Sequence, residues 1–157
     1  MTERNINTTG ESREFVTMNV GSQLCGIPVL QVQDVLGPQK ITRVSLAPPE
    51  VAGSLNLRGR IVTAVDLRLR MGLEPRSDGE DSMSVVVEHN GELYSLMVDS
   101  VGEVLKVPAE TFEPNPATLD PTWRRYSEGV YRLKEGLLVV LDSDNLLDYG
   151  AAATVSA

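Results

Sequence analysis

Apolar residues alternate with polar ones along most of this chain, in short runs that Gly, Pro, Asn and Asp interrupt. Alternation with a period of two is the pattern of a β-strand that is buried on one face. Together with two hairpins described below, the pattern predicts roughly ten short strands and few helices. The strands outside those hairpins are expected at 15–20, 24–27, 41–46, 83–88, 93–99 and 101–107.

Two stretches, residues 53–66 and 129–142, repeat one pattern. In each, alternating apolar residues lead to a tight turn, and an apolar run follows that ends in aspartate. The opening glycines and the closing aspartates align without a gap, at one offset of 76 residues. Each copy therefore predicts a β-hairpin. A short acceptor side chain favours a turn or a helix start, so Asp66 and Asp142 are expected to act as caps rather than as a catalytic pair.

A weaker echo matches Gly21 and Val35 with Gly91 and Val104, at offsets of 69 to 70 residues. Two copies are too few for a solenoid, whose units must stack about threefold to bury a core. A chain of 157 residues can bury one core, whereas two independent domains of about 75 residues would each be marginal. The sequence therefore predicts an all-β protein of two small, pseudo-symmetric barrels.

Helical pieces are expected to be short. Residues 28–36 start with proline and carry apolar residues at helical spacing, which favours one or two helical turns ended by Gly37 and Pro38. Residues 108–121 contain four prolines and predict a surface connection that Trp123, as a partly buried residue, anchors to the body. Further helical pieces are expected just before Gly53, at 67–71 and at 142–149.

The ends of the chain are polar or rich in small residues. Residues 1–12 and 150–157 are therefore expected to be disordered, and 13–149 to form a single domain of two intertwined barrels. The acidic loop 73–81 is the expected boundary between the two halves. The N-terminus has no apolar signal core, and no run approaches the roughly 18 to 20 apolar residues of a membrane span, so a cytoplasmic protein is expected.

The net charge of the chain and its small number of Cys and His residues restrict the possible partners and metal sites. A net charge of −8 disfavours nucleic acid and anionic lipid as partners, which leaves proteins or small molecules. One cysteine and one histidine are too few for a zinc site. Cys25 is expected to be a small buried hydrophobe, and His89 a solvated turn residue.

No catalytic or nucleotide-binding motif emerges. Gly53 and Gly102 stand without the other glycines of a phosphate-binding loop, and the acidic residues near 78–81 lack the spacing of a calcium loop. We therefore expect no enzyme activity, metal or cofactor. Arg58 is the exception, because a planar cation at a hairpin corner is either a solvated turn residue or a side chain that pins two surfaces together.

Several segments resemble CheW, the adaptor family of bacterial chemotaxis. The residues that carry the resemblance are 53–62, with the sequence Gly-Ser-Leu-Asn-Leu-Arg-Gly-Arg-Ile-Val, followed by 65–68, 29–35, 41–44 and 96–101. It extends from about Phe15 to Tyr149. It implies two five-stranded barrels of the Src-homology-3 type around a shared core, and no enzyme activity. It further implies a stand-alone adaptor that couples the cytoplasmic tip of a methyl-accepting chemoreceptor to the histidine kinase CheA.

The resemblance also implies two contact surfaces. The receptor-facing residues would be Val32, Asp34, Val35, Arg58, Val98 and Val101. The kinase-facing residues would be Gly53, Leu55 and Asn56, with the missing side chain of Gly53 leaving room for a partner's backbone. Contacts with other CheW-like domains, and recruitment to membrane-associated receptor arrays, would follow.

Two alternatives stay open. A protein with this fold could couple receptors to a kinase in a signalling array that does not control motility. A small metabolite-binding barrel is the alternative from another class, and it would need a converging set of polar side chains that the sequence does not supply.

Overall fold

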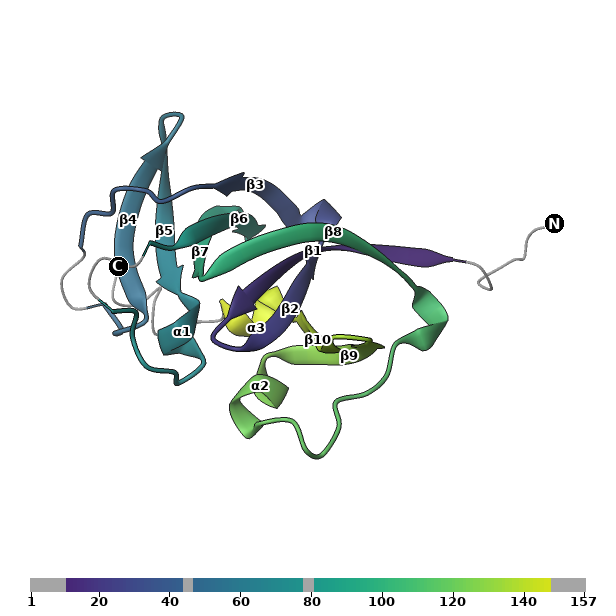
Figure 1. Cartoon of the computed structure of the whole chain (residues 1–157). Coiled ribbons are helices and arrows are strands. Elements are labelled where there is room, and N and C mark those ends of the chain that lie inside the picture. Colours follow the sequence, from purple (N-terminus) through teal and green to yellow (C-terminus); the bar gives the residue numbers. More distant parts are fainter. Residues whose placement is uncertain (1–10, 44–46, 78–80, 148–157) are drawn as a thin grey trace.

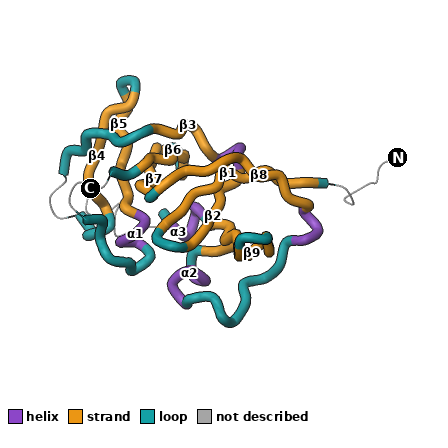
Figure 2. The backbone as a smooth tube through the Cα atoms, viewed as in Figure 1, coloured by secondary structure: helices purple, strands orange, loops and turns teal. Residues whose placement is uncertain are grey.

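The computed structural model describes residues 11–43, 47–77 and 81–147. These residues form ten strands, joined by short helical pieces (Figures 1 and 2). The first five strands are β1 (Ser12–Val20), β2 (Gln23–Pro28), β3 (Val32–Leu36), β4 (Val51–Leu57) and β5 (Arg60–Asp66). The other five are β6 (Met83–His89), β7 (Glu92–Val98), β8 (Ser100–Pro108), β9 (Ser127–Leu133) and β10 (Gly136–Leu141).

The strands form two five-stranded sheets, and each of the two sequence repeats contributes strands to both sheets. One sheet, here called barrel 1, has the order β8-β1-β2-β10-β9, and the other, barrel 2, has the order β3-β6-β7-β5-β4. Each repeat of five strands places its first hairpin in one sheet and its last three strands in the other. Strands β3 and β8 are the crossing strands, and both run along the upper side of the molecule in Figure 1. The predicted all-β fold of two five-stranded units is confirmed.

The two copied hairpins hold equivalent places. In barrel 2 the β4–β5 hairpin lies at the end of the sheet and pairs in parallel with β7, while in barrel 1 the β9–β10 hairpin pairs in parallel with β2. Gly53 pairs with Ala64 beside a shift of register. Gly129 pairs with Val140 beside the corresponding shift. The predicted equivalence of the two hairpins is therefore confirmed.

The closing aspartates cap short helices, as predicted. Asp66 accepts a hydrogen bond of 3.0 Å from the backbone N–H of Arg68 at the start of α1 (Leu67–Arg70). Asp142 accepts one of 3.1 Å from the N–H of Asp144 in α3 (Ser143–Leu146). The remaining helical pieces are α2 (Pro121–Arg125) and the 3₁₀ turns η1 (Val29–Gln31) and η2 (Ala109–Thr111).

Some local predictions are wrong. Of residues 28–36 only η1 is helical, because β3 pairs with β6 and this pairing outweighs the helical spacing of a short apolar segment. The helical piece expected before Gly53 is the start of β4. In the strand expected at 41–46, Thr42 forms only an isolated bridge with Ser54.

Several predictions involve residues that the structure does not describe. Residues 1–10, 44–46, 78–80 and 148–157 lie outside the described part of the chain. The predictions of disordered ends and of the centre of the acidic loop therefore stay predictions. At the N-terminal boundary, Ser12 already belongs to β1, where it pairs with Pro108.

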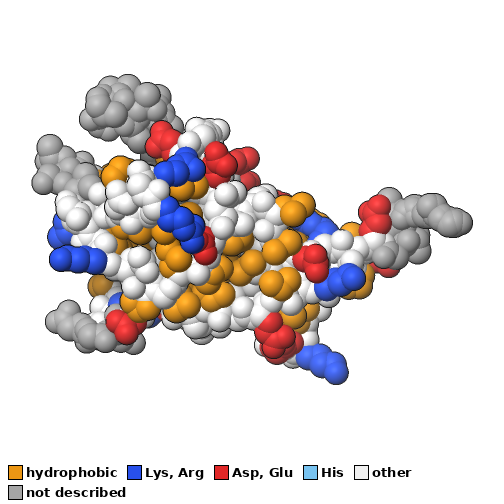
Figure 3. Space-filling model, turned by 90° about the horizontal axis from the view of Figure 1, so that it is seen from above, with side chains coloured by type: hydrophobic (Ala, Val, Ile, Leu, Met, Phe, Trp, Pro, Cys, Tyr) orange, Lys and Arg blue, Asp and Glu red, His pale blue; other side chains and the backbone are white. Residues whose placement is uncertain are grey.

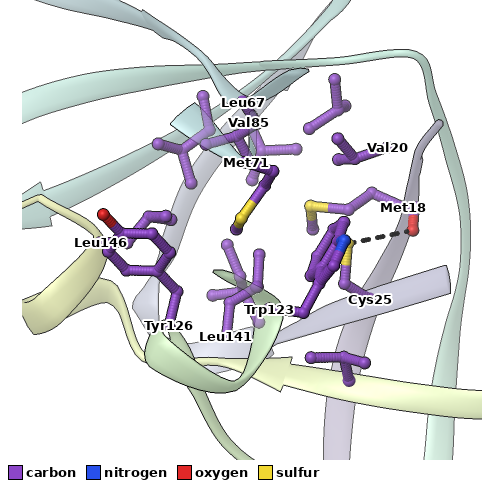
Figure 4. Close-up of a cluster of buried hydrophobic side chains, with 14 of the residues drawn as sticks. Met18, Val20, Cys25, Leu67, Met71, Val85, Trp123, Tyr126, Leu141 and Leu146 are labelled. Carbon is purple, nitrogen blue, oxygen red and sulfur yellow. Dashed lines mark hydrogen bonds between the residues drawn. The ribbon is translucent and has the colours of Figure 1, made fainter. Parts of the chain in front are cut away.

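The largest hydrophobic cluster lies between the two sheets and draws on both repeats. It contains Met18 and Cys25 from barrel 1, Val85 from barrel 2, and side chains from all three α-helices (Figure 4). Trp123 and Tyr126 are only 6% and 5% exposed, so they are core residues rather than a partly buried anchor. Burying each large apolar side chain contributes about 1.5 to 3 kcal/mol, and this shared cluster is what joins the barrels.

We expect the two caps to differ in their contribution to stability. Asp142→Ala removes only a cap and should lower the free energy of unfolding by about 1 kcal/mol. Asp66→Ala should cost more than about 2 kcal/mol, because Asp66 also pairs with Arg76 at 3.2 Å and its side chain is 13% exposed. Urea unfolding measures both, with the exposed turn variant Glu135→Ala as the control. Equal losses would mean that the Arg76 pair contributes nothing to stability.

Candidate functional site

The tip of the β4–β5 hairpin stands beside β3. Arg58 and Gly59 form its two-residue turn with φ values of 52° and 84°, the combination that a type I′ hairpin requires. The Asn56 side chain fixes this turn by accepting a hydrogen bond of 3.0 Å from the Gly59 N–H. Arg58 is thereby held in a conformation that is uncommon for a residue other than glycine.

Arg58 forms an ion pair with Asp34 on β3. Its Nη2 lies 2.9 Å from Asp34 Oδ2, and the two side chains are 75% and 24% exposed. Such an exposed pair contributes at most about 1 kcal/mol to stability. A guanidinium has five N–H donors, and the exposure of Arg58 keeps most of it in contact with solvent. The structure therefore brings together two predicted receptor-facing residues and leaves the cation accessible to a partner.

The other predicted receptor-facing residues differ in exposure. Val35 is 39% exposed on β3, whereas Val32 is partly buried against the main core cluster. Val101 is also partly buried against that cluster. Val98 has no exposed surface at all. The prediction that Val98 contacts a partner directly is therefore wrong. Its buried side chain can only support the receptor-facing residues from beneath.

The predicted kinase-facing residues need a similar correction. Asn56 is exposed, but Leu55 is only 5% exposed and belongs to the small core cluster of barrel 2. Gly53 is buried with a φ of +151°, and a Cβ there would collide with the backbone carbonyl of Thr42. The room that Gly53 leaves is thus filled by the protein's own chain, so the expected mechanism, close approach of a partner, is wrong.

Three exposed apolar side chains were missed by sequence reasoning. Leu30 on η1 is 93% exposed, Ile61 on β5 is 69% exposed, and Val104 on β8 is 50% exposed. Val104 holds in β8 the place that Val35 holds in β3, as the weak echo in the sequence indicated. Leu30 escaped notice because it lies outside the apolar face of the helix predicted at residues 28–36, and nothing in the local pattern marks it as part of an exposed apolar surface.

One face of the molecule carries many hydrophobic side chains. Figure 3 shows the molecule from the side on which Figure 1 draws β3, β8 and the tip of the β4–β5 hairpin. Hydrophobic side chains form a band across the middle of this face, with Lys and Arg side chains beside it. A hollow of about 430 Å³ is lined by Ser12, Arg13, Glu14, Pro28, Val29, Leu30 and Lys106. Concentrated exposed apolar surface with a polar margin is typical of protein interaction sites.

Cys25 and His89, the two residues that could serve as a nucleophile or a base, are not available for chemistry. Burial, and secondarily the charge of Asp99, raise the pKa of the Cys25 thiol, which removes its use as a thiolate nucleophile. His89 is not a solvated turn residue as predicted, since its side chain is 12% exposed and its Nδ1 lies 3.2 Å from Asp144 Oδ1. Within the described ranges, no group of His, Cys, Asp or Glu is arranged to hold a metal ion.

The arrangement is therefore that of a protein-binding scaffold, in which two interlocked barrels present an apolar face with an accessible cation. Comparisons with known proteins agree with this class. The profile of the CheW-like domain family matches residues 14–150. The chemotaxis protein CheW of Klebsiella aerogenes is 31% identical over 143 residues, which cover 91% of this chain and 86% of the relative.

Two further matches support the same relationship. The chemotaxis protein CheW of Helicobacter pylori is 27% identical over 137 residues, or 87% of this chain and 82% of the relative. The crystal structure of the scaffolding protein TtCheW from Thermoanaerobacter tengcongensis is 28% identical, with a TM-score of 0.74 over 83% of this chain and 89% of that one. The chain belongs to the CheW-like domain family, whose members are chemotaxis scaffold or adaptor proteins without enzyme activity.

The helices of the described part of the chain are short, and none has the length and apolar character that crossing a membrane requires.

We expect Gly53 to be essential for the fold. In Gly53→Asp the new side chain meets the Thr42 carbonyl and occupies an unfavourable φ, so the free energy of unfolding should fall by at least about 2 kcal/mol. Gly59→Ala is the matched control, because Gly59 also has a positive φ but no atoms within 4 Å of a Cβ, and it should cost about 1 kcal/mol. Urea unfolding measures both variants. Wild-type stability in Gly53→Asp would restore the interpretation that a partner approaches Gly53.

Proposed function

We propose that this protein is an adaptor that couples the cytoplasmic tip of methyl-accepting chemoreceptors to the histidine kinase CheA. The observation that carries the proposal is the Arg58–Asp34 pair, an accessible cation beside the exposed apolar residue Val35. The family membership supports the coupling role, since relatives of similar length are named as chemotaxis proteins and scaffolding proteins. The adaptor would act in the cytoplasm, at receptor arrays.

The receptor-facing surface is proposed to consist of β3, η1, β8 and the tip of the β4–β5 hairpin. It combines Val32, Asp34, Val35, Arg58 and Val101 with the exposed side chains of Leu30 and Val104. The partner segment in this proposal is an amphipathic helix of the receptor tip, which would bind by laying its apolar face on such a surface. Arg58 can then add hydrogen bonds to carbonyls or carboxylates of the helix, while Asp34 keeps the guanidinium oriented.

The kinase-facing surface is proposed to lie on the outer side of the β4–β5 hairpin. Asn56 pairs with Ile61 across the two strands, so both side chains point to the same face of the sheet. Ile61 is the more exposed apolar residue there, at 69%. Gly53 and Leu55 act from beneath by shaping the hairpin. Contacts with other CheW-like domains are part of the same proposal.

We expect Arg58→Ala to weaken receptor binding selectively. Truncating an interface anchor costs about 2 kcal/mol, roughly thirtyfold in affinity, whereas a solvated arginine costs within about 0.5 kcal/mol. The test titrates the variant against a soluble receptor fragment and against CheA, with circular dichroism to confirm folding. Arg60→Ala is the matched control, because Arg60 is an exposed arginine on the same hairpin.

Kinase affinity should stay near its wild-type value in Arg58→Ala. Ile61→Ser should show the reverse pattern, with weaker kinase binding and unchanged receptor binding. Equal losses for both partners, or no loss for either, would contradict the assignment of two separate surfaces. Co-purification from cell extract identifies the array. Recovery of a kinase that does not control motility would favour the alternative function, coupling in a non-motility signalling array.

A further inference from the structure

Asp99 occupies the point at which the chain passes from one barrel to the other. It lies between β7 of barrel 2 and β8 of barrel 1. Its N–H donates to the Asn19 carbonyl at 2.9 Å, and its Oδ2 accepts from the Gly21 N–H at 2.6 Å. Both of these partners belong to the β1–β2 hairpin of barrel 1. Asp99 therefore ties the crossover to barrel 1 through two hydrogen bonds.

Two arginines tie the same carboxylate to barrel 2. Arg68 of α1 places Nη1 3.2 Å from Asp99 Oδ2. Arg76 places Nε 3.1 Å from Asp99 Oδ1, which is an ion-pair contact without the geometry of a hydrogen bond. Arg76 also reaches Asp66 at the end of β5, with Nη1 3.2 Å from Oδ1. A third contact of Arg76 runs from Nη2 to the Met97 carbonyl at 3.3 Å. The Arg76 guanidinium thus contacts Asp66 at the end of β5, the Met97 carbonyl near the end of β7, and Asp99 at the crossover.

The charges in this cluster are balanced and largely shielded from solvent. The Arg76 and Asp66 side chains are 10% and 13% exposed, and those of Arg68 and Asp99 are 22% and 24% exposed. Two cations face two carboxylates, so removing Arg76 would leave two poorly hydrated carboxylates with a single counter-charge. A shielded pair is costly to break because the remaining charge is not compensated, and salt screens it only weakly.

Packing reinforces the link across the barrels. Leu73, three residues before Arg76, lies over the Gly21 turn so closely that a Cβ on Gly21 would come within 2.9 Å of Leu73 Cδ1. The pseudo-equivalent crossover, from β2 to β3, runs through Val29–Gln31 and has no charged residue. The charged link is therefore a property of one crossover and not of the duplicated fold.

We propose that Arg76, with Asp66, Asp99 and Arg68, is a clamp that holds the two barrels in one orientation. Without Arg76, Asp99 keeps its hydrogen bonds to barrel 1 and its ion pair with Arg68, but it loses the cation that links it to the Asp66 carboxylate. The shared apolar core still joins the barrels, but apolar packing is not directional and permits small rotations. The clamp supplies the directional contacts.

One consequence of the clamp rests on the proposed function. Val35 and Arg58 belong to barrel 2, while Val101 and Val104 belong to β8 of barrel 1 and follow Asp99 closely in the chain. A receptor helix that contacts both sets needs them at a fixed separation. A change of barrel orientation should therefore weaken receptor binding without altering any contact residue, which makes Arg76 a positioning residue.

The test measures the distance between the barrels directly. Spin labels are attached at Lys134→Cys in barrel 1 and Glu88→Cys in barrel 2, both at exposed positions. The native Cys25 is fully buried and its pKa is raised by burial, so it stays unlabelled in the folded protein. Double electron–electron resonance spectroscopy then gives the distribution of distances between the two spin labels. We expect a single narrow distribution for the otherwise wild-type chain, and a broader or shifted one for Arg76→Ala.

Two controls separate a clamp from a merely stabilising side chain. Arg132→Ala removes an exposed arginine that binds Glu113 within barrel 1, and it should leave the distribution unchanged. Asp99→Asn keeps an acceptor for the Gly21 N–H but removes the charge, so it should broaden the distribution even if Arg76→Ala does not fold. A side chain that only stabilises the fold changes the melting temperature but not the distance within folded molecules. A narrow, unshifted distribution in the folded clamp variants would overturn the proposal.

Binding supplies a second measurement. Arg76→Ala should lower the affinity for a receptor fragment about tenfold, a size typical of residues that act on a site from a distance. Unchanged receptor affinity together with a broadened distance distribution would retain the clamp and reject its consequence for binding. If the wild-type protein binds neither receptor nor kinase, the proposed function fails, while the distance measurement still decides whether the clamp exists.

Discussion

The division of each repeat between the two sheets, with β3 and β8 as the crossing strands, is the constraint on which the rest of the structure depends. Each repeat of five strands contributes only part of each barrel, so neither sheet can be completed without the other repeat. An isolated repeat of about 75 residues would bury too little apolar surface to be stable by itself. The division removes this difficulty, because the largest apolar cluster lies between the sheets and draws on both repeats. One shared core thus takes the place of two marginal ones.

The same division decides where the interaction surface lies. It brings the crossing strands to one side of the molecule, so Val35 of one repeat and Val104 of the other lie on crossing strands of that side (Figures 1 and 3). A surface assembled from two barrels is only as well defined as their relative orientation. The cluster around Asp99, at one of the two crossovers, is therefore placed where a few ionic contacts have the largest effect on that surface.

Duplication also explains two of the buried glycines, Gly53 and Gly129. In barrel 2 a preceding segment crosses Gly53, and a Cβ there would collide with the Thr42 carbonyl. In barrel 1 the corresponding segment crosses Gly129, and a Cβ there would come within 2.6 Å of the Glu113 carbonyl. The isolated bridges Thr42–Ser54 and Glu113–Val130 are the hydrogen-bonded results of this close approach. Both glycines are thus required by a backbone crossing inside the protein, which is why the pattern recurs at the same offset.

The sequence by itself determined the local elements and their duplication. Period-two alternation, tight turns such as the one around Gly59, and capping by Asp66 and Asp142 depend on neighbours in the chain, so they can be read without the fold. Only the tertiary structure decided that Val32–Leu36 is a strand, that Val98 and Leu55 are buried, and that Leu30 is exposed. It also decided that Thr42 fills the space beside Gly53, and that Arg76 reaches Asp66 and Asp99. These features depend on which distant segments pair, and the division of each repeat between the barrels sets that pairing through contacts that no local pattern encodes.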